Sequence, residues 1–242
     1  MTPIAERLKV RALSGALALV AACALGACGG GGAASDDAAA TAENPLDDPA
    51  NLDVWLQRLE VGSREIFAAR DAVADAVALQ DGERVADIGA GTGLYSFLFA
   101  DAVGDAGVVF AVDIEPRFLT LINQRASDLE IVNVTPVLGR ADSVTLPPHS
   151  VDVVFISDTY NYFYRPDALM ETVRTALAPG GRLFILDFDI EEGAARSAEN
   201  AHVRVGKDAL AEEVASFGFE FVGPVAVDGL AETYMLAFRK PA

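Results

Sequence analysis

The residues best suited to bind a ligand lie in one glycine-rich run, Val85-Ala86-Asp87-Ile88-Gly89-Ala90-Gly91-Thr92-Gly93. Glycines at this spacing let a ligand lie against bare backbone, where the free N–H groups of a following helix are exposed. The spacing is Gly-x-Gly-x-Gly, whereas the dinucleotide fingerprint requires Gly-x-Gly-x-x-Gly, so the turn need not be shaped for a pyrophosphate. The Asp87 carboxylate repels phosphate and suits a cationic amino-acid group. The run therefore predicts a binding site for a ligand that carries such a group.

A second carboxylate, Asp113, ends an apolar run about 20 residues beyond the glycines, where sheets of this type usually place a ligand for sugar hydroxyls. The alternative for Asp113 is a cap on a helix that begins at Pro116.

Candidates for the reaction itself lie in Ser157-Asp158-Thr159-Tyr160-Asn161-Tyr162-Phe163-Tyr164-Arg165-Pro166. Asp158 or Tyr160 could accept a proton there, but an aromatic-rich loop also suits a lid or a hydrophobic wall. His202 either helps to build an acceptor pocket or is an ordinary loop residue. Arg64 lies among acidic residues on an N-terminal helix. It either forms ion pairs on a solvated helix face or binds a ligand carboxylate.

Alternating helices and strands must position these side chains. Strands are predicted at 84–88, 108–112, 134–138, 151–156, 182–187, 220–227 and 233–238. Helices are predicted over 52–79 with a break at Gly62-Ser63, and at 94–102, 116–126, 166–177 and 207–217. Continuous apolar strands that alternate with helices imply an α/β fold with a doubly wound, mostly parallel sheet covered on both faces, closed by an antiparallel pair.

Composition narrows the possible functions. The 242 residues include 18 lysines and arginines against 36 acids, a formal net charge of −18, so a nucleic-acid partner is not expected. The apolar fraction of 52% suffices for one globular domain, assigned to residues 51–242 with N-terminal helices over 51–80. Two cysteines, Cys23 and Cys28, and two histidines, His149 and His202, predict neither a disulfide framework nor a metal site. The sequence leaves the oligomeric state open.

The N-terminal residues predict export. Arg7, Lys9 and Arg11 precede an uncharged apolar stretch over 12–27, which is typical of a secretory signal peptide, assigned to residues 1–27. Residues 28–50 begin with four glycines after the cysteine and are rich in alanine and aspartate, which predicts a flexible acidic linker.

Leu25-Gly26-Ala27-Cys28 resembles the lipobox of bacterial lipoproteins, and Val20-Ala21-Ala22-Cys23 is a second, weaker match. The resemblance implies cleavage before Cys28, lipidation of its thiol and a membrane anchor in the cell envelope, at the outer membrane if the source has two membranes. The alternative is an uncleaved or mis-assigned N-terminus, with the domain in the cytoplasm.

Five features between residue 70 and the C-terminus occur in the order typical of the class I S-adenosylmethionine-dependent methyltransferases, which this chain resembles. They are the run 85–93, Ala111-Val112-Asp113, Gly139-Arg140-Ala141-Asp142, Val151-Asp152-Val153-Val154-Phe155, and Leu177-Ala178-Pro179-Gly180-Gly181-Arg182-Leu183. The resemblance implies a Rossmann-like sheet of seven strands with an antiparallel final strand, and S-adenosylmethionine as the cofactor.

The resemblance also implies roles for individual residues. The methionine portion of the cofactor would contact the glycine turn, and the ribose hydroxyls would contact Asp113. Ile114 would pack on adenine, while Ala141 and Asp142 would hold its edge, unless Asp142 is a loop carboxylate without a ligand. The turn residues of this set are Asp87, Gly89, Ala90, Gly91 and Gly93, with Arg64 as the candidate from the helix before them.

Related enzymes often carry two histidines where this chain has Asn161 and Tyr162, so the proton acceptor is open among Asp158, Tyr160 and His202. Methyl transfer mainly requires alignment of donor and acceptor, and the acceptor would be a small molecule or a protein side chain in the envelope. Because S-adenosylmethionine is made in the cytoplasm, a second hypothesis is a non-catalytic lipoprotein that binds a nucleoside. A third hypothesis, a nicotinamide-dependent oxidoreductase, is disfavoured by the glycine spacing.

Overall fold

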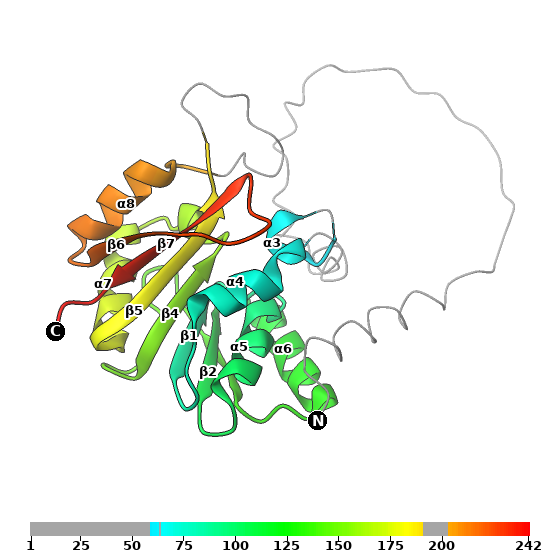
Figure 1. Cartoon of the computed structure of the whole chain (residues 1–242). Coiled ribbons are helices and arrows are strands. Elements are labelled where there is room, and N and C mark those ends of the chain that lie inside the picture. The colour runs from blue at the N-terminus through cyan, green and yellow to red at the C-terminus, as the bar shows by residue number, and fades with distance from the viewer. Residues whose placement is uncertain (1–58, 63, 191–202) are drawn as a thin grey trace, which may run out of the picture.

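The computed structural model describes residues 59–62, 64–190 and 203–242, which form one sheet flanked by helices (Figure 1). The strands are β1 (Arg84–Ile88), β2 (Val108–Asp113), β3 (Val134–Leu138), β4 (Val151–Ser157), β5 (Leu177–Phe188), β6 (Glu220–Val225) and β7 (Thr233–Arg239). The helices are α3 (Glu65–Ala68), α4 (Arg70–Val77), α5 (Leu94–Val103), α6 (Pro116–Leu129), the 3₁₀ turn η4 (Tyr160–Tyr162), α7 (Pro166–Ala176) and α8 (Lys207–Ser216).

The strand order is β3-β2-β1-β4-β5-β7-β6, with β1 to β5 parallel. Strand β7 lies antiparallel between β5 and β6. This arrangement confirms the predicted fold class, including the antiparallel last strand. The order reverses between β1 and β4, so the carboxyl ends of β1, β2 and β4 border the place where ligands bind in such sheets.

Helices cover both faces because consecutive strand residues point to opposite sides. Val85 and Val153 pack with α4 and α5 in one apolar cluster, whereas Ala86 and Val154 pack with α7 and α8 in the other. Figure 1 shows α7 and α8 on one side of the sheet and α4, α5 and α6 on the other. Buried phenylalanines fill the first cluster, with Phe99 and Phe155 ring centroids 5.0 Å apart.

Two element boundaries differ from the prediction by three residues or more. Helix α6 continues beyond residue 126 to Leu129, whose side chain is buried, and ends at Glu130 in the left-handed conformation. Strand β5 begins at Leu177, before the predicted 182, because the Gly180 N–H donates to the Lys240 carbonyl at 3.0 Å and Lys240 donates to the Gly181 carbonyl. Backbone pairing with the C-terminal residues thus extends the strand through the Pro-Gly-Gly run.

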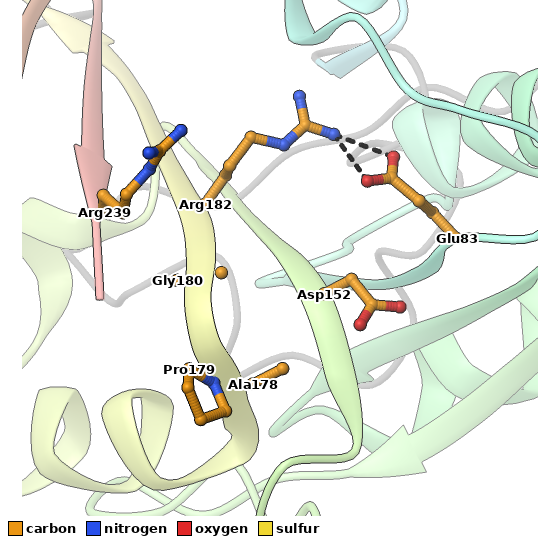
Figure 2. A pocket seen from close by; sticks show the side chains of 8 residues that line it. Glu83, Asp152, Ala178, Pro179, Gly180, Arg182 and Arg239 are labelled. Carbon is orange, nitrogen blue, oxygen red and sulfur yellow. Dashed lines mark hydrogen bonds and ion pairs between the residues drawn. The ribbon is translucent and has the colours of Figure 1, made fainter. Parts of the chain in front are cut away.

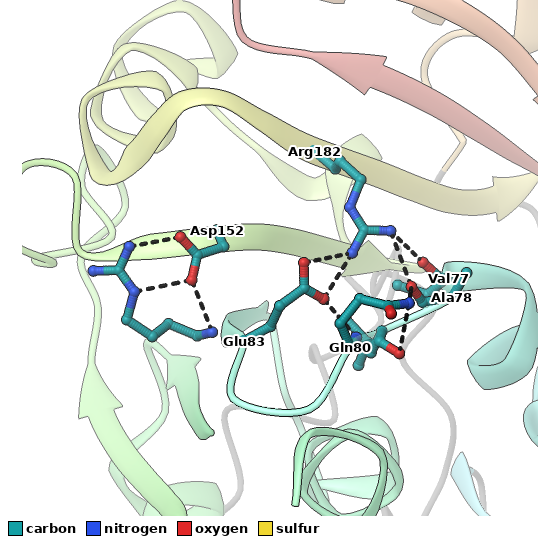
Figure 3. A network of polar contacts seen from close by, with 8 residues as sticks. Val77, Ala78, Gln80, Glu83, Asp152 and Arg182 are labelled. Atoms are coloured by element: carbon teal, nitrogen blue, oxygen red, sulfur yellow. Dashed lines mark hydrogen bonds and ion pairs between the residues drawn. The ribbon is translucent and has the colours of Figure 1, made fainter. Parts of the chain in front are cut away.

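Ion pairs join the strands at the amino edge, opposite the glycine turn. Arg84 and Asp152 connect β1 to β4, with Nη2 and Oδ1 2.6 Å apart. Arg182 of β5 binds Glu83 at 2.8 Å and donates to the Val77 carbonyl at the end of α4 (Figure 3). A shallow hollow of about 310 Å³ lies here, lined by Glu83, Asp152, Ala178–Arg182 and Arg239 (Figure 2). Three of its four charged side chains take part in these ion pairs, so this edge stabilises the sheet.

No helix among residues 59–62, 64–190 and 203–242 has the length and hydropathy needed to cross a membrane. Within the same residues, no group of three or more His, Cys, Asp and Glu side chains is arranged to hold a metal ion. The predicted signal peptide and linker, Cys28 and His202 lie outside the described residues.

Candidate functional site

The glycine turn connects β1 to α5 at the carboxyl edge of the sheet. Its backbone is held against the neighbouring strand, since the Gly89 and Ala90 N–H groups both donate to the Val112 carbonyl, at 2.8 and 3.1 Å. The Ala90 side chain is buried. Gly93 precedes α5 in the left-handed conformation, with φ of +81°. These contacts fix the turn beside the end of β2.

The three glycines of the turn lie against different neighbouring residues. A Cβ at Gly89 would lie 2.3 Å from Oγ1 and Cγ2 of Thr159, and one at Gly93 would lie 2.9 Å from Ile122. At Gly91, the nearest atom to an added Cβ is Leu59 Cδ1 at 3.6 Å. Of the three glycines, only Gly91 could therefore carry a Cβ without a steric clash, whereas the sequence pattern had assigned all three to the ligand.

Asp113 links the turn to the end of β2. Its Oδ2 accepts a hydrogen bond from the Gly91 N–H at 2.8 Å, and its Oδ1 accepts from the Glu115 N–H at 2.9 Å. The side chain of Glu115 accepts from the Arg117 N–H and caps α6, so the alternative of Asp113 as the helix cap is wrong. The backbone of Ile114 also donates to this carboxylate, so three backbone groups hold it at the end of β2. A carboxylate has about four acceptor sites, so it can still accept from a ligand hydroxyl.

The electrostatic setting of Asp113 is acidic. Burial raises the pKa of Asp113, although hydrogen bonds from the backbone oppose this shift. Burial also raises the pKa of Asp87 to about 7, while a hydrogen bond from the Ser96 hydroxyl, 2.6 Å away, lowers it and the charge of Asp113 raises it. A cationic ligand group would lower the pKa of both carboxyls.

Ile114, Ala141 and Asp142 surround the end of β2. The Ile114 side chain is 65% exposed, unusual for isoleucine, and Ala141 and Asp142 are exposed in the loop after β3. The Gly139 N–H donates to the Asp113 carbonyl at 2.9 Å, which holds that loop beside β2. Asp142 faces Arg140 at 3.9 Å. An exposed apolar side chain and a loop edge thus flank Asp113, as the assigned adenine contacts require.

Asp158 directly follows β4 and forms an ion pair with Arg64. Its backbone has φ of +45°, and its N–H donates to the Leu186 carbonyl of β5 at 2.8 Å. Left-handed backbone at a non-glycine residue is uncommon and concentrates at functional sites. The position of Arg64 brings the N-terminal segment to the carboxyl edge, where its observed partner is Asp158.

Tyr160 points away from this edge into the core. It is fully buried, and its hydroxyl donates to Glu213 Oε1 of α8 at 3.2 Å. Burial raises the pKa of its phenol well above the ordinary value, and the Glu213 charge raises it further. A fully buried phenol that is paired with Glu213 cannot reach a substrate, so we withdraw Tyr160 as a candidate proton acceptor.

Two residues at the edge were not assigned a role from the sequence, although Tyr162 lies in the candidate run 157–166. Tyr162 is 60% exposed beside Asp158, and partial burial together with the Asp158 charge raises its pKa to about 12. Asp187, near the end of β5, is fully buried and accepts from the Phe188 N–H at 2.9 Å. The sequence feature that could have identified Asp187 was an acidic residue at the end of the fifth predicted apolar strand.

Acidic side chains thus mark the carboxyl ends of four neighbouring strands: Asp113 on β2, Asp87 on β1, Asp158 after β4 and Asp187 on β5. Such an edge favours a ligand with positive charge and disfavours a pyrophosphate.

The order of these features along the chain matches a known family model, described as a methyltransferase domain, over residues 79–221. The chain belongs to this methyltransferase domain family. The match extends from just before β1 into β6 and contains the glycine turn, Asp113 and Asp158.

Relatives of the methyltransferase domain include two enzymes named ubiquinone/menaquinone biosynthesis C-methyltransferase UbiE. The enzyme of Vibrio campbellii is 34% identical over 115 residues, 47% of this chain and 44% of the relative. The enzyme of Psychromonas ingrahamii is 29% identical over 140 residues, 57% of this chain and 55% of the relative. This chain therefore spans about half the length of these curated relatives.

Solved structures share the fold of the domain. A SAM-dependent methyltransferase from Aquifex aeolicus superposes with a TM-score of 0.66 and 21% identity, covering 79% of this chain and 98% of the other. The [4+2]-cyclase SpnF superposes with a TM-score of 0.63 and 19% identity, covering 75% and 84%. These neighbours support the Rossmann-like methyltransferase fold.

Proposed function

We propose that this protein is an S-adenosylmethionine-dependent methyltransferase that acts on a small molecule or a protein side chain in the cell envelope. The observation that carries the proposal is the pairing of Asp113 with Gly91, because it places a carboxylate beside the one glycine of the turn where an added Cβ would not clash. Membership of the methyltransferase domain family gives the reaction type.

The donor set fits this cofactor. Carboxylates at the ends of β1 and β2 suit an ammonium, a sulfonium and a ribose diol, and the exposed Ile114 offers an apolar surface for a base. Bound S-adenosylmethionine supplies a methyl group on a sulfonium for in-line displacement. Asp113 would hold the ribose and the segment from Gly89 to Gly91 the methionine portion, with Asp87 beneath the turn. Ala141 and Asp142 would border the adenine.

The acceptor side is assigned to the loop after β4. Asp158 remains the candidate proton acceptor among the described residues singled out from the sequence, and His202 remains a candidate from the segment outside them. The pairing of Asp158 with Arg64 orients its carboxylate. The two UbiE relatives are named as C-methyltransferases of quinone biosynthesis, which makes a small aromatic acceptor a reasonable first class to assay.

A second candidate is a non-catalytic, nucleoside-binding lipoprotein with the same fold. We retain this candidate because the fold alone does not determine methyl transfer: a similar structure is described as a [4+2]-cyclase, a name that refers to another reaction. We further propose that Cys28 is lipidated and anchors the domain in the envelope; the lipobox-like run 25–28 supports this assignment.

Isothermal titration of the protein with S-adenosylmethionine, S-adenosylhomocysteine and NAD tests the proposal. We expect binding of the two sulfur-containing nucleosides and a clear preference for them over NAD. Preference for NAD would overturn the proposal. Binding without methyl transfer to quinol-like acceptors or envelope extracts would favour the non-catalytic alternative.

A further inference from the structure

Exposed apolar side chains gather at the carboxyl edge of the sheet. Ile114 directly follows β2, Leu138 ends β3, and Tyr162 and Tyr164 follow β4, with exposed fractions from 55% to 89%. Exposed apolar residues are normal when they are scattered singly, but several at one edge indicate a surface that meets something other than water. Ile114 is already assigned to the adenine, so we call Leu138, Tyr162 and Tyr164 the apolar rim.

The apolar rim is broad. Strands β3 and β4 are separated by β2 and β1, so their ends lie about 14 Å apart at the usual spacing of strands. The Asp167 carboxylate and, less strongly, that of Asp142 raise the pKa of Arg165, so the loops after β3 and β4 are close enough for their charges to interact. A partner that touches both sides of the apolar rim therefore has to be extended, as a lipid surface is.

The charged side chains that flank the apolar rim are paired. Arg140 faces Asp142 in the loop after β3, and Arg165 binds Asp167 at the start of α7, with Nη2 and Oδ2 2.7 Å apart. The two pairs add no net charge beside the apolar rim, although the whole chain has a net charge of −18. Exposed arginines can also turn to phosphate groups while their carbon stems lie against apolar surface. Apolar, tyrosine and arginine side chains together are typical of the headgroup level of a membrane.

The chain that follows the proposed anchor joins the domain at the same edge. Cys28 precedes Leu59, the first described residue, and Leu59 Cδ1 lies 3.6 Å from a Cβ built at Gly91. The next residue, Glu60, pairs with Arg125 of α6 at 2.6 Å. These contacts hold the start of the described chain against the glycine turn. The tether from Cys28 therefore enters at the edge that carries the apolar rim.

We propose that the apolar rim docks on the phospholipid surface to which Cys28 is anchored, with its side chains among the headgroups. The inference rests on the proposed function, because it takes the lipid on Cys28 as the attachment. Docking orients the domain and does not attach it: the anchor keeps the apolar rim near the surface, so a contact too weak to bind vesicles alone is populated. In this orientation the loop after β4, with Asp158, faces the bilayer.

The opposite edge of the sheet supplies a matched control. Val132 lies just before β3 and is 89% exposed, the same fraction as Tyr164. It follows the exposed acids Asp128 and Glu130, which an anionic surface repels. If apolar exposure alone decided membrane contact, Val132 would dock as readily as Tyr164.

The first test labels single cysteines in the full, anchored chain. Cleavage before Cys28 removes Cys23, and acylation consumes the Cys28 thiol, so the anchored protein offers no competing native thiol. A fluorophore on Leu138→Cys, Tyr164→Cys or Val132→Cys is measured in vesicles of phosphatidylcholine and phosphatidylglycerol that carry a nitroxide quencher on the headgroups. We expect roughly twofold or stronger quenching at positions 138 and 164 and none at 132, because a docked surface lies within about 10 Å of the headgroups.

Equal quenching at the three positions, quenching confined to position 132, or quenching at none would overturn the docking of the apolar rim. Self-quenching of the label at position 164 that grows with protein density would place a second copy of the chain on the apolar rim and would also overturn it. Failure to bind S-adenosylmethionine would overturn the proposed enzyme and leave this comparison unchanged.

An N-terminus without lipid would overturn the anchor. The comparison of positions 164 and 132 is then repeated on the full chain with Cys23 and Cys28 both changed to serine. Quenching at 164 but not at 132 would still support docking of the apolar rim, and equal or absent quenching would overturn it.

The second test changes the charge beside the apolar rim. Arg140→Glu with Arg165→Glu should lower the ratio of docked to undocked domain on the anionic vesicles roughly fivefold or more, read from the label at position 138, because acids replace the arginines of both pairs. Arg174→Glu with Arg239→Glu makes the same change of charge toward the opposite edge and should leave this ratio unchanged. Equal ratios in the two double variants would overturn the docking of the apolar rim.

Discussion

The Asp113 carboxylate orders the backbone at Gly91 and Glu115 and is also the proposed ligand for the ribose hydroxyls. We expect Asp113→Ala to weaken the affinity for S-adenosylmethionine by about 1–3 kcal/mol, since hydrogen-bonding partners in a partly buried site would lose their acceptor. Titration calorimetry measures this loss. Asp113→Asn keeps the shape of the side chain and separates loss of charge from disorder of the turn, and the exposed Asp105→Ala is the control. Unchanged affinity in Asp113→Ala would reject its role.

Asp87 should make stability depend on pH. Burial raises its pKa from 3.8 to about 7 in the folded protein, so between these values the folded state holds a proton that the unfolded chain releases. Stability from this group therefore falls as pH rises from about 4 to about 7. Asp87→Asn should remove this fall and gain at least about 1.4 kcal/mol relative to wild type between pH 5 and pH 8, which corresponds to a tenfold change in proton affinity. Urea unfolding at both pH values measures the difference, and a constant difference would contradict the raised pKa.

At the scale of single residues, the sequence predicted the positions that follow from local pattern. Asp113 and the glycine turn lie where strand ends and glycine spacing placed them. Tyr160 was misassigned because the direction of a side chain in a loop depends on its packing partner, here Glu213, which lies 53 residues further along the chain. Neither the Arg64–Asp158 nor the Thr159–Gly89 contact has a local signal.

At the scale of elements, the first strand-to-helix turn and the loop after β4 depend on one another. Gly89 and Gly180 have nearly equal φ values, +71° and +72°, but an added Cβ would collide with Thr159 at Gly89 and meets nothing within 4 Å at Gly180. Both alanine variants should be destabilised by the left-handed backbone conformation. Gly89→Ala should lose about 1–3 kcal/mol more of the free energy of unfolding, because its Cβ overpacks against Thr159. Urea unfolding of the two variants measures this excess. In the double variant Gly89→Ala/Thr159→Ala, part of this extra destabilisation should be recovered. Equal destabilisation by the two glycine substitutions would instead show that the loop after β4 moves away without cost.

Element positions were predictable to the extent that they depend on apolar runs and helix signals. β1 and β3 match their predicted bounds, and α5 extends by one residue. The start of β5 was not predictable, because pairing of Gly180 and Gly181 with Lys240 is a contact between distant residues that carries the strand through a run that usually ends one.

At the scale of the whole molecule, charge and anchoring are linked. A chain with a net charge of −18 is repelled by anionic lipid surfaces, so the proposed lipid on Cys28 would have to provide membrane attachment without electrostatic help. Cys28→Ser should therefore move the protein from the membrane to the soluble fraction of cells, whereas Cys23→Ser, the matched control, should leave it membrane-bound. A high-salt wash should not release wild type, because salt does not weaken the insertion of acyl chains into a membrane. Mass spectrometry should find a diacylglycerol-modified N-terminus at Cys28. An unmodified N-terminus at Met1, or retention of Cys28→Ser on the membrane, would contradict the anchor. In that case the domain would work where S-adenosylmethionine is made, and the acceptor would have to be sought there.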